Sequence, residues 1–304
     1  MHIGLGVMKM KYELIVRFPG MKPPVVCPSF WEIKPFYGCK FNCSYCYLLG
    51  TLWGKKIIPW KKYMERMERL GREILDFLKE EPPCLLNSGE LADSLMMEKT
   101  VFPFVPWITE VLQEFGNGHK HLIVTKDVAV HHLLEIDGQD VNVVSFSVNP
   151  LPVWRWEKLT PHPERRLKAA RKLQNAGYEV RIRIDFPVWE AGLPLKEILR
   201  VVENHIDFIY RYVEPSRFTL GVPRINNPRL WRYSFWQRLK KDMEKVGRNI
   251  WRYNREKSLE IYRREIDKIR EYDSKVPIAL CKETMQMYDA LELDYENIKC
   301  NCIL

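Results

Sequence analysis

The strongest constraint on the fold is the alternation of short apolar runs with amphipathic segments through residues 30–222. Short apolar runs indicate buried strands, and apolar residues at helical spacing indicate helices. We expect strands at 30–36, 84–90, 121–126, 141–149, 179–188 and 217–222, and helices at 56–79, 105–115, 129–136, 163–177 and 194–205. This alternation predicts an α/β fold with parallel strands, arranged as an open or barrel-like sheet. About six strands are too few for a complete eight-stranded barrel.

The chain has 304 residues and 46% hydrophobic residues, enough for one substantial core. No run approaches the roughly 18 apolar residues of a membrane helix, and Lys9, Lys11 and Glu13 interrupt the first segment, unlike a signal peptide. We therefore expect a soluble cytoplasmic protein without a membrane segment. The expected regions are an N-terminal extension (1–30), a barrel core (31–223) and a basic helical C-terminal region with a cysteine-rich tail (224–304).

Cys39, Cys43 and Cys46 lie in the segment "CKFNCSYC", directly after the first expected strand. Structural zinc sites prefer four ligands, and no second Cys or His pair follows nearby. Three closely spaced thiolates instead suit three irons of a [4Fe–4S] cluster, which leaves the fourth iron open. An open iron predicts that a substrate or cofactor binds there.

The segment "CKFNCSYC" resembles the CxxxCxxC loop of radical S-adenosylmethionine (SAM) enzymes. In that superfamily, SAM binds the fourth iron, and an electron from the cluster cleaves SAM to methionine and a 5′-deoxyadenosyl radical. The "SGE" turn (Ser88, Gly89 and Glu90) resembles the family's GGE turn, which receives the methionine amino group. The resemblance implies a partial parallel β/α barrel, SAM and a [4Fe–4S] cluster as cofactors, and an electron donor of the flavodoxin or ferredoxin type.

Within the superfamily, the chain is most similar to the spore photoproduct lyase family between about residues 35 and 187. The segments "YCYL", "VTK" and "FSVN" carry this resemblance in the same order. It implies that Lys126, Ser147 and Asn149 contact the carboxylate and ribose of SAM, and that Tyr45 and Tyr47 flank the cluster as catalytic residues. The alternatives are that Lys126 is a loop cation, that Ser147 and Asn149 cap a strand end, and that the two tyrosines are core aromatic residues with a polar tip.

One departure from the family concerns the hydrogen-atom donor. The lyase carries a Cys just after its second strand, which donates a hydrogen atom to the substrate radical. The corresponding segment here, "SGELADSL", has no Cys between Ser88 and Leu95. Cys84 precedes the turn and is expected at the far end of the sheet. Thymine-dimer reversal by the family's own route is therefore not predicted.

The final segment contains Cys281, Cys300 and Cys302, three of the eight cysteines of the chain. Soft thiolate ligands at this density favour iron–sulfur or zinc binding. We predict a second [4Fe–4S] cluster, with Cys27 as a weak candidate for its fourth ligand. The alternative is that Cys281 is simply buried and that Cys300 and Cys302 are frayed terminal thiols that bind no metal.

The segment from Arg224 to Lys275 contains 16 Lys and Arg against 8 Asp and Glu, so it carries +8 of the net charge of +9. Its apolar residues predict an amphipathic helix, and they are Trp231, Phe235, Leu239, Met243 and Val246. Aromatic residues interleaved with basic ones suit nucleic-acid binding, and the predicted phosphate contacts are Arg248, Arg252 and Arg255. Ordinary solvent-exposed helices are the alternative.

Three functions remain. The first is a radical SAM enzyme that repairs or modifies a base in nucleic acid. The second is a radical SAM enzyme that modifies a peptide, protein or small molecule, with the tail cluster as an electron relay or substrate anchor. The third is a non-catalytic, metal-stabilised nucleic-acid-binding module. The third is disfavoured because "SGE", "VTK" and "FSVN" all serve a cofactor in the family that they resemble.

Overall fold

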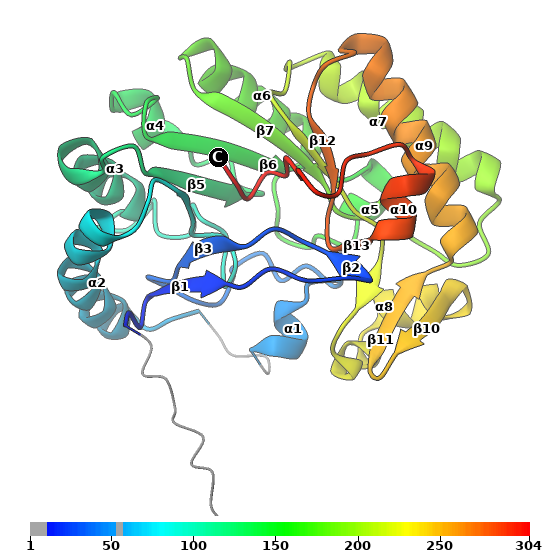
Figure 1. Ribbon diagram of the computed structural model, residues 1–304, viewed down its shortest axis with the longest axis horizontal. Helices are drawn as coiled ribbons and strands as arrows, with labels where there is room; N and C mark the ends of the chain where they lie inside the picture. Colours follow the sequence, from blue (N-terminus) through cyan, green and yellow to red (C-terminus); the bar gives the residue numbers. More distant parts are fainter. Residues whose placement is uncertain (1–10, 53–56) are drawn as a thin grey trace, which may run out of the picture.

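The computed structural model describes residues 11–52 and 57–304. Its centre is an eight-stranded sheet that curls into a half-barrel (Figure 1). In spatial order the strands are β1 (Ile15–Phe18), β3 (Phe30–Ile33), β4 (Leu85–Asn87), β5 (Lys120–Thr125), β6 (Asn142–Ser147), β7 (Glu179–Ile184), β8 (Phe218–Leu220) and β12 (Ile278–Leu280). The strands from β3 to β12 are parallel, and β1 is antiparallel to β3. The predicted partial parallel β/α barrel is confirmed.

The longer helices follow strands along the chain and cover the outer side of the half-barrel (Figure 1). The longer ones are α2 (Trp60–Glu80), α3 (Phe104–Phe115), α6 (Pro163–Asn175), α7 (Leu195–Tyr210) and α9 (Arg255–Tyr272), and the shorter ones are α1 (Leu48–Thr51), α4 (His131–Glu135), α5 (Leu151–Trp154) and α10 (Met285–Ala290). In α2 the helical spacing of the apolar residues fixes the buried face, which contains Leu70, Ile74 and Phe77.

Two strands of the sheet lie outside the region predicted to form the barrel. β1 belongs to the expected N-terminal extension, and β12 belongs to the expected C-terminal region. Both are short, with four and three residues, and such segments carry too little periodicity to be recognised. The sheet therefore has eight strands rather than about six.

The basic region is not the continuous helix expected over residues 231–246. It forms η1 (Pro228–Arg232), α8 (Ser234–Leu239) and η2 (Lys240–Asp242), and then an antiparallel sheet of β9 (Arg224–Ile225), β11 (Ile250–Tyr253) and β10 (Met243–Gly247). The hairpin explains the difference over residues 243–246, because β10 pairs with β11 through a turn in which Asn249 has a positive φ of 63°. Tight hairpin turns require such residues, and a helix would not accommodate them.

A second small sheet connects the two ends of the described chain. β2 (Val25–Val26) pairs antiparallel with β13 (Glu283–Thr284), so that Val26 lies opposite Glu283. This pairing brings Cys27 close to the segment that follows β12. Among the described residues, no helix has the length and apolar character needed to cross a membrane.

Candidate functional site

The three-cysteine loop follows β3, at the carboxyl end of the parallel strands. Gly38 and Asn42 have positive φ angles of 80° and 49°, which let the backbone turn sharply around Cys39 and Cys43. The backbone N–H of Cys46 donates to the carbonyl of Cys43 at 3.0 Å. These features hold the three thiols in one compact loop.

In this loop Cys43 is buried, and Cys39 and Cys46 are partly buried. Burial raises the pKa of Cys39 to about 12 and also raises the pKa values of Cys43 and Cys46. Within residues 11–52 and 57–304, no three His, Cys, Asp or Glu side chains form a group that could hold one metal ion. In an iron–sulfur cluster each thiolate binds its own iron, so three thiols need not converge on one point. The donor set, three thiols without a fourth protein ligand, suits a cluster with one open iron.

The "SGE" turn follows β4, beside the loop. A Cβ atom on Gly89 would lie 2.5 Å from Cβ of Val124, so the close approach of the turn to β5 requires glycine. The side chain of Asn87 accepts from the N–H of Gly89 at 2.8 Å and donates to Oε1 of Glu90 at 3.0 Å. The Ser88 hydroxyl is buried, 2.8 Å from both Ser94 and His121. Of these three residues, Glu90 is the one with a charged side chain, a carboxylate.

Tyr47 connects the cysteine loop with this turn. Its hydroxyl donates to the carbonyl of Glu90 and lies 3.5 Å from Oε2 of the same residue. The Tyr47 side chain is 48% exposed. The carboxylate of Glu90 is therefore oriented by Asn87 on one oxygen, while the long contact with Tyr47 is the only one that its second oxygen makes among the described residues.

Three charged or polar side chains meet at the carboxyl ends of β5, β6 and β7. The ammonium of Lys126 donates to the Ser147 hydroxyl and lies 3.9 Å from the carboxylate of Asp185. Ser147 in turn donates to Asp185 at 2.7 Å. Burial raises the pKa of Asp185, but the charges of Arg183 and Lys126 outweigh it, so the pKa lies below the ordinary value. The structure thus brings the predicted residues Lys126 and Ser147 together.

Asn149 and Tyr45 belong to a fully buried network beneath these side chains. The Asn149 amide donates to the Tyr45 hydroxyl at 2.8 Å and to Glu157 at 2.9 Å. Its oxygen accepts from the backbone N–H groups of Asp185 and Phe186 at 3.0 and 3.1 Å. Both halves of the amide are therefore engaged within the protein.

Glu157 is the centre of this network, and sequence reasoning did not identify it. Tyr45 and Arg166 both donate to its carboxylate, and the Lys126 ammonium lies 3.5 Å away. Burial raises the pKa of Glu157, but the charges of Lys126 and Arg166 outweigh that effect and lower it overall. Arg183 and Asp185 were also missed, although they lie at the carboxyl end of β7, the strand next to the one that Asn149 follows.

The remaining cysteines fall into two groups. Cys84 lies at the opposite end of β4, where its sulfur is 3.3 Å from Nδ1 of His119. The structure brings the tail residues Cys281, Cys300 and Cys302 together with Cys27: Arg183 contacts the sulfur atoms of both Cys281 and Cys302, Cys300 lies beside Cys302, and the β2–β13 pairing brings Cys27 to the same place.

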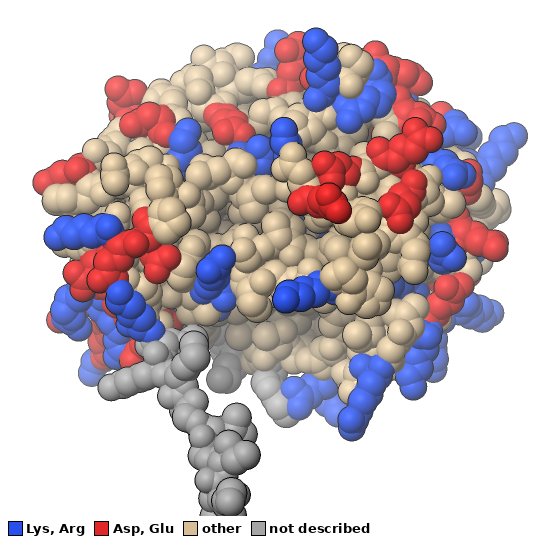
Figure 2. All heavy atoms as spheres, viewed as in Figure 1, with Lys and Arg blue, Asp and Glu red and all other residues tan. Residues whose placement is uncertain are grey.

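The basic region presents exposed cations around an aromatic hollow. The hollow, of about 390 Å³, is lined by Trp231, Lys240, Met243 and Trp251. The two indole rings meet edge to face at 5.6 Å, and the Lys245 ammonium lies 6.0 Å above the Trp251 ring. Figure 2 shows Lys and Arg side chains along the lower right, over β10 and β11.

Arg252 does not belong to this surface. Its guanidinium donates to Glu283 at 2.6 Å and to the carbonyl of Lys282 at 2.7 Å, and its side chain is 11% exposed. The expectation that Arg252 contacts phosphate is therefore wrong, because its charge is neutralised inside the protein. Arg248 and Arg255 are exposed.

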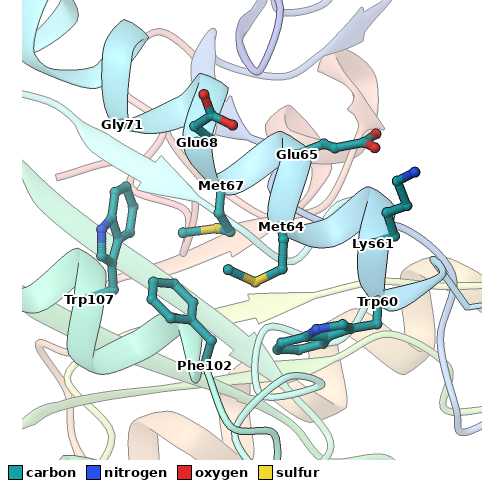
Figure 3. A pocket seen from close by; sticks show the side chains of 9 residues that line it. All are labelled: Trp60, Lys61, Met64, Glu65, Met67, Glu68, Gly71, Phe102 and Trp107. Atoms are coloured by element: carbon teal, nitrogen blue, oxygen red, sulfur yellow. The ribbon is translucent and has the colours of Figure 1, made fainter.

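A larger groove, of about 740 Å³, lies between α2 and the start of α3. Figure 3 shows Met64, Met67, Phe102 and Trp107 directed toward it, with Trp60 at one end. None of its nine lining residues belongs to the predicted cofactor, cluster or tail residues. Its position on the outer helices separates it from the polar network described above.

Comparison with known proteins agrees with this arrangement. The family model described as spore photoproduct lyase matches residues 28–207. Three similar solved structures are of spore photoproduct lyase. A double mutant with bound AdoMet and dinucleoside spore photoproduct has 19% sequence identity and a TM-score of 0.62, and the match covers 86% of this chain and 77% of that chain. A single mutant (19% identity, TM-score 0.65) and a complex with dinucleoside spore photoproduct (18% identity, TM-score 0.63) each match over 90% of this chain and 79% of that chain. No curated protein matches the sequence.

These findings define an enzyme of the radical SAM class. The family match covers more than half of the chain and includes the cysteine loop, the "SGE" turn, Lys126, Ser147 and Asn149. The chain belongs to the spore photoproduct lyase family.

Proposed function

We propose that Cys39, Cys43 and Cys46 ligate a [4Fe–4S] cluster whose fourth iron takes SAM. The observation that carries this proposal is the position of the three-thiol loop beside the "SGE" turn, at the carboxyl ends of the strands. A parallel sheet presents its ligands at that edge. Bound SAM would supply a 5′-deoxyadenosyl radical after reduction by an electron donor of the flavodoxin or ferredoxin type.

The polar groups near the loop match the charges of SAM. Glu90 offers a carboxylate oxygen to the amino group of SAM, and the Ser88–Gly89 backbone approaches closely because Gly89 lacks a Cβ atom. Lys126 offers a cation to the SAM carboxylate, and Ser147 and Asp185 offer hydrogen bonds to ribose hydroxyls. These residues bind and orient the cofactor.

Asn149 and the two tyrosines support these groups. Because the Asn149 amide is fully engaged, we assign it to holding the backbone at Asp185 and the hydroxyl of Tyr45 in place. Tyr47 positions the Glu90 turn against the cysteine loop, and its exposed ring borders the proposed SAM site. Tyr45 packs 4.5 Å from the Phe186 ring and excludes water beneath the loop.

The first test concerns the acid of the turn. Replacing Glu90 by Ala should weaken SAM binding by about 10–100-fold, since a charge-assisted hydrogen bond contributes about 1.5–3 kcal/mol. The iron content should not change, because Glu90 is not a proposed iron ligand. Anaerobic titration with SAM, followed by EPR of the reduced cluster, measures both quantities.

Glu65→Ala is the matched control, because Glu65 is an exposed acid on α2. This variant should bind SAM as tightly as the unmodified protein. Equal SAM affinity in Glu90→Ala would remove Glu90 from the site.

We propose nucleic acid as the substrate, with repair or modification of a base as the reaction. The basic surface and the hollow between Trp231 and Trp251 support this proposal, since aromatic rings stack on bases while nearby cations neutralise phosphates. A family member of the same fold has been solved in complex with a dinucleoside spore photoproduct. Modification of a peptide, protein or small molecule is the alternative.

The second test is the salt dependence of binding to DNA. Lys240, Lys245 and Arg248 are exposed and have no ion-pair partner within the described part of the chain. Replacing all three by Ala should flatten the slope of log K against log salt by up to about 2.7, or about 0.9 for each phosphate of duplex DNA that is no longer neutralised. Fluorescence anisotropy with a labelled duplex at several salt concentrations measures the slope.

Lys62, Lys79 and Lys99 provide the matched control, because they are also exposed but lie on or next to the outer helices α2 and α3. Their replacement removes the same charge and should leave the slope nearly unchanged. A slope near zero in the unmodified protein, or an equal flattening in both variants, would favour the peptide or small-molecule alternative.

A further inference from the structure

The segment after α10 enters the half-barrel and lies on the face of the sheet that carries the proposed SAM residues. The side chain of Asn301 donates to the Ser145 hydroxyl and to the carbonyl of Ile182, both at 2.9 Å. Ser145 and Ser147 lie two residues apart on β6, so their side chains share one face. In Figure 1 this segment crosses in front of β6 and ends near β5.

Arg181 on β7 and Arg217, directly before β8, hold the same segment. Arg181 donates to the carbonyls of Asn301 and Ile303 at 3.1 and 2.6 Å, and Arg217 donates to the carbonyl of Cys300 at 2.8 Å. The backbone around Cys300 and Cys302 is therefore fixed inside the barrel, and both residues are buried.

Four thiols from three separate segments meet at this place. Cys27 follows β2, Cys281 follows β12, and the β2–β13 pairing brings these two segments together. The thiols of Cys300 and Cys302 are hydrogen-bonded to each other, and Cys27 and Cys281 also lie within interaction range of Cys300. The four thiols therefore belong to one group.

Two guanidinium groups donate to sulfur in this group. Arg224 donates to the sulfur of Cys281 at 3.1 Å. Arg183 bridges two thiols, with one nitrogen 3.6 Å from the sulfur of Cys302 and the other 3.8 Å from that of Cys281. Guanidinium groups beside buried sulfur stabilise negative charge there. N–H donors to sulfur also raise the reduction potential of iron–sulfur centres.

We propose that Cys27, Cys281, Cys300 and Cys302 ligate a second [4Fe–4S] cluster that is closed, with one thiolate for every iron. The ligand set distinguishes it from the loop of Cys39, Cys43 and Cys46, which leaves one iron open. A closed cluster has no iron for a substrate ligand, so this centre is not a substrate anchor. Four thiols also match a single zinc ion in number, but among the described residues no three of them converge on one point, and the test separates the two metals.

The experiment measures metal and sulfide in the full chain after anaerobic reconstitution. The unmodified protein should contain about eight irons and eight sulfides, four of each per cluster. The Cys39→Ser/Cys43→Ser/Cys46→Ser variant should keep about half of both. Iron that disappears completely in this variant, or zinc in place of iron, would overturn the proposal.

The fourth ligand is tested by Cys27→Ser, with Cys84→Ser as the matched control, since both remove one partly buried thiol. Cys27→Ser should lose up to about half of the iron and keep the EPR signal of the loop cluster, which changes on addition of SAM. Cys84→Ser should lose none. Full iron content in Cys27→Ser would exclude Cys27 as a ligand.

The arginine contacts give an independent readout. In the variant that lacks the loop cysteines, the remaining EPR signal should not change when SAM is added. Arg224→Gln in that background should shift the midpoint potential to a more negative value, because the substitution removes a cation and a donor to sulfur. A signal that responds to SAM would overturn the closed ligand set. Because this background cannot bind SAM through the loop, its iron content tests the second centre independently of the proposed reaction.

Discussion

Replacing Cys39, Cys43 and Cys46 by Ser is expected to abolish the formation of 5′-deoxyadenosine. The three thiols are the proposed ligands of the cluster that reduces SAM, and without them no electron reaches the sulfonium. Anaerobic incubation with SAM and dithionite, followed by mass spectrometry, should detect no product above the protein-free background.

Cys84→Ser is again the appropriate control, because Cys84 lies at the opposite end of β4 and contacts His119 rather than the loop. This variant should form 5′-deoxyadenosine at the rate of the unmodified protein. Product formation by the triple variant would mean that the loop does not hold the reducing cluster.

Arg166→Met is expected to cause the largest loss of stability. Arg166 and Glu157 form an ion pair in which both side chains are fully buried, and Arg166 also donates to the carbonyl of Ser147 at 2.9 Å. Removing one partner of a buried ion pair leaves the other charge uncompensated, which costs about 3–5 kcal/mol. Urea-induced unfolding, followed by circular dichroism, measures the free energy of unfolding.

Lys168→Met is the control on the same helix. Lys168 pairs with Glu164 at 2.7 Å, but both side chains are exposed, so water replaces the missing partner. No measurable change in the free energy of unfolding is expected. Similar losses of stability in both variants would mean that burial of the Arg166–Glu157 pair has no special effect on stability.

The parts of the fold and site that follow from local pattern were predictable. The periodicity of residues 30–222 predicts the central strands, and parallel strands place their carboxyl ends at one edge. Lys126 and Ser147 lie at the ends of two such strands, and the structure places their side chains in contact. Proximity of this kind follows from topology alone.

Other parts depend on contacts that the sequence does not encode locally. Glu157 acquires its role only because Tyr45 and Arg166 approach it from different segments. Cys27 joins the tail cysteines through a ladder of two-residue strands, too short to produce a periodic pattern. The expected helix over residues 231–246 was extended too far: residues 234–239 form α8, but Met243 and Val246, which also fit helical spacing, lie in β10.

The pairing of β2 with β13 has a consequence for how the chain folds. It joins residues near positions 26 and 283, and β12 completes the sheet by pairing with β8. Pairings between residues so far apart in sequence close large loops, and folding slows as such contacts increase. During synthesis, the edge of β8 stays unpaired until residues 278–280 have left the ribosome. Unpaired strand edges promote aggregation, so the half-barrel is most vulnerable to it in the interval before its last strand is added.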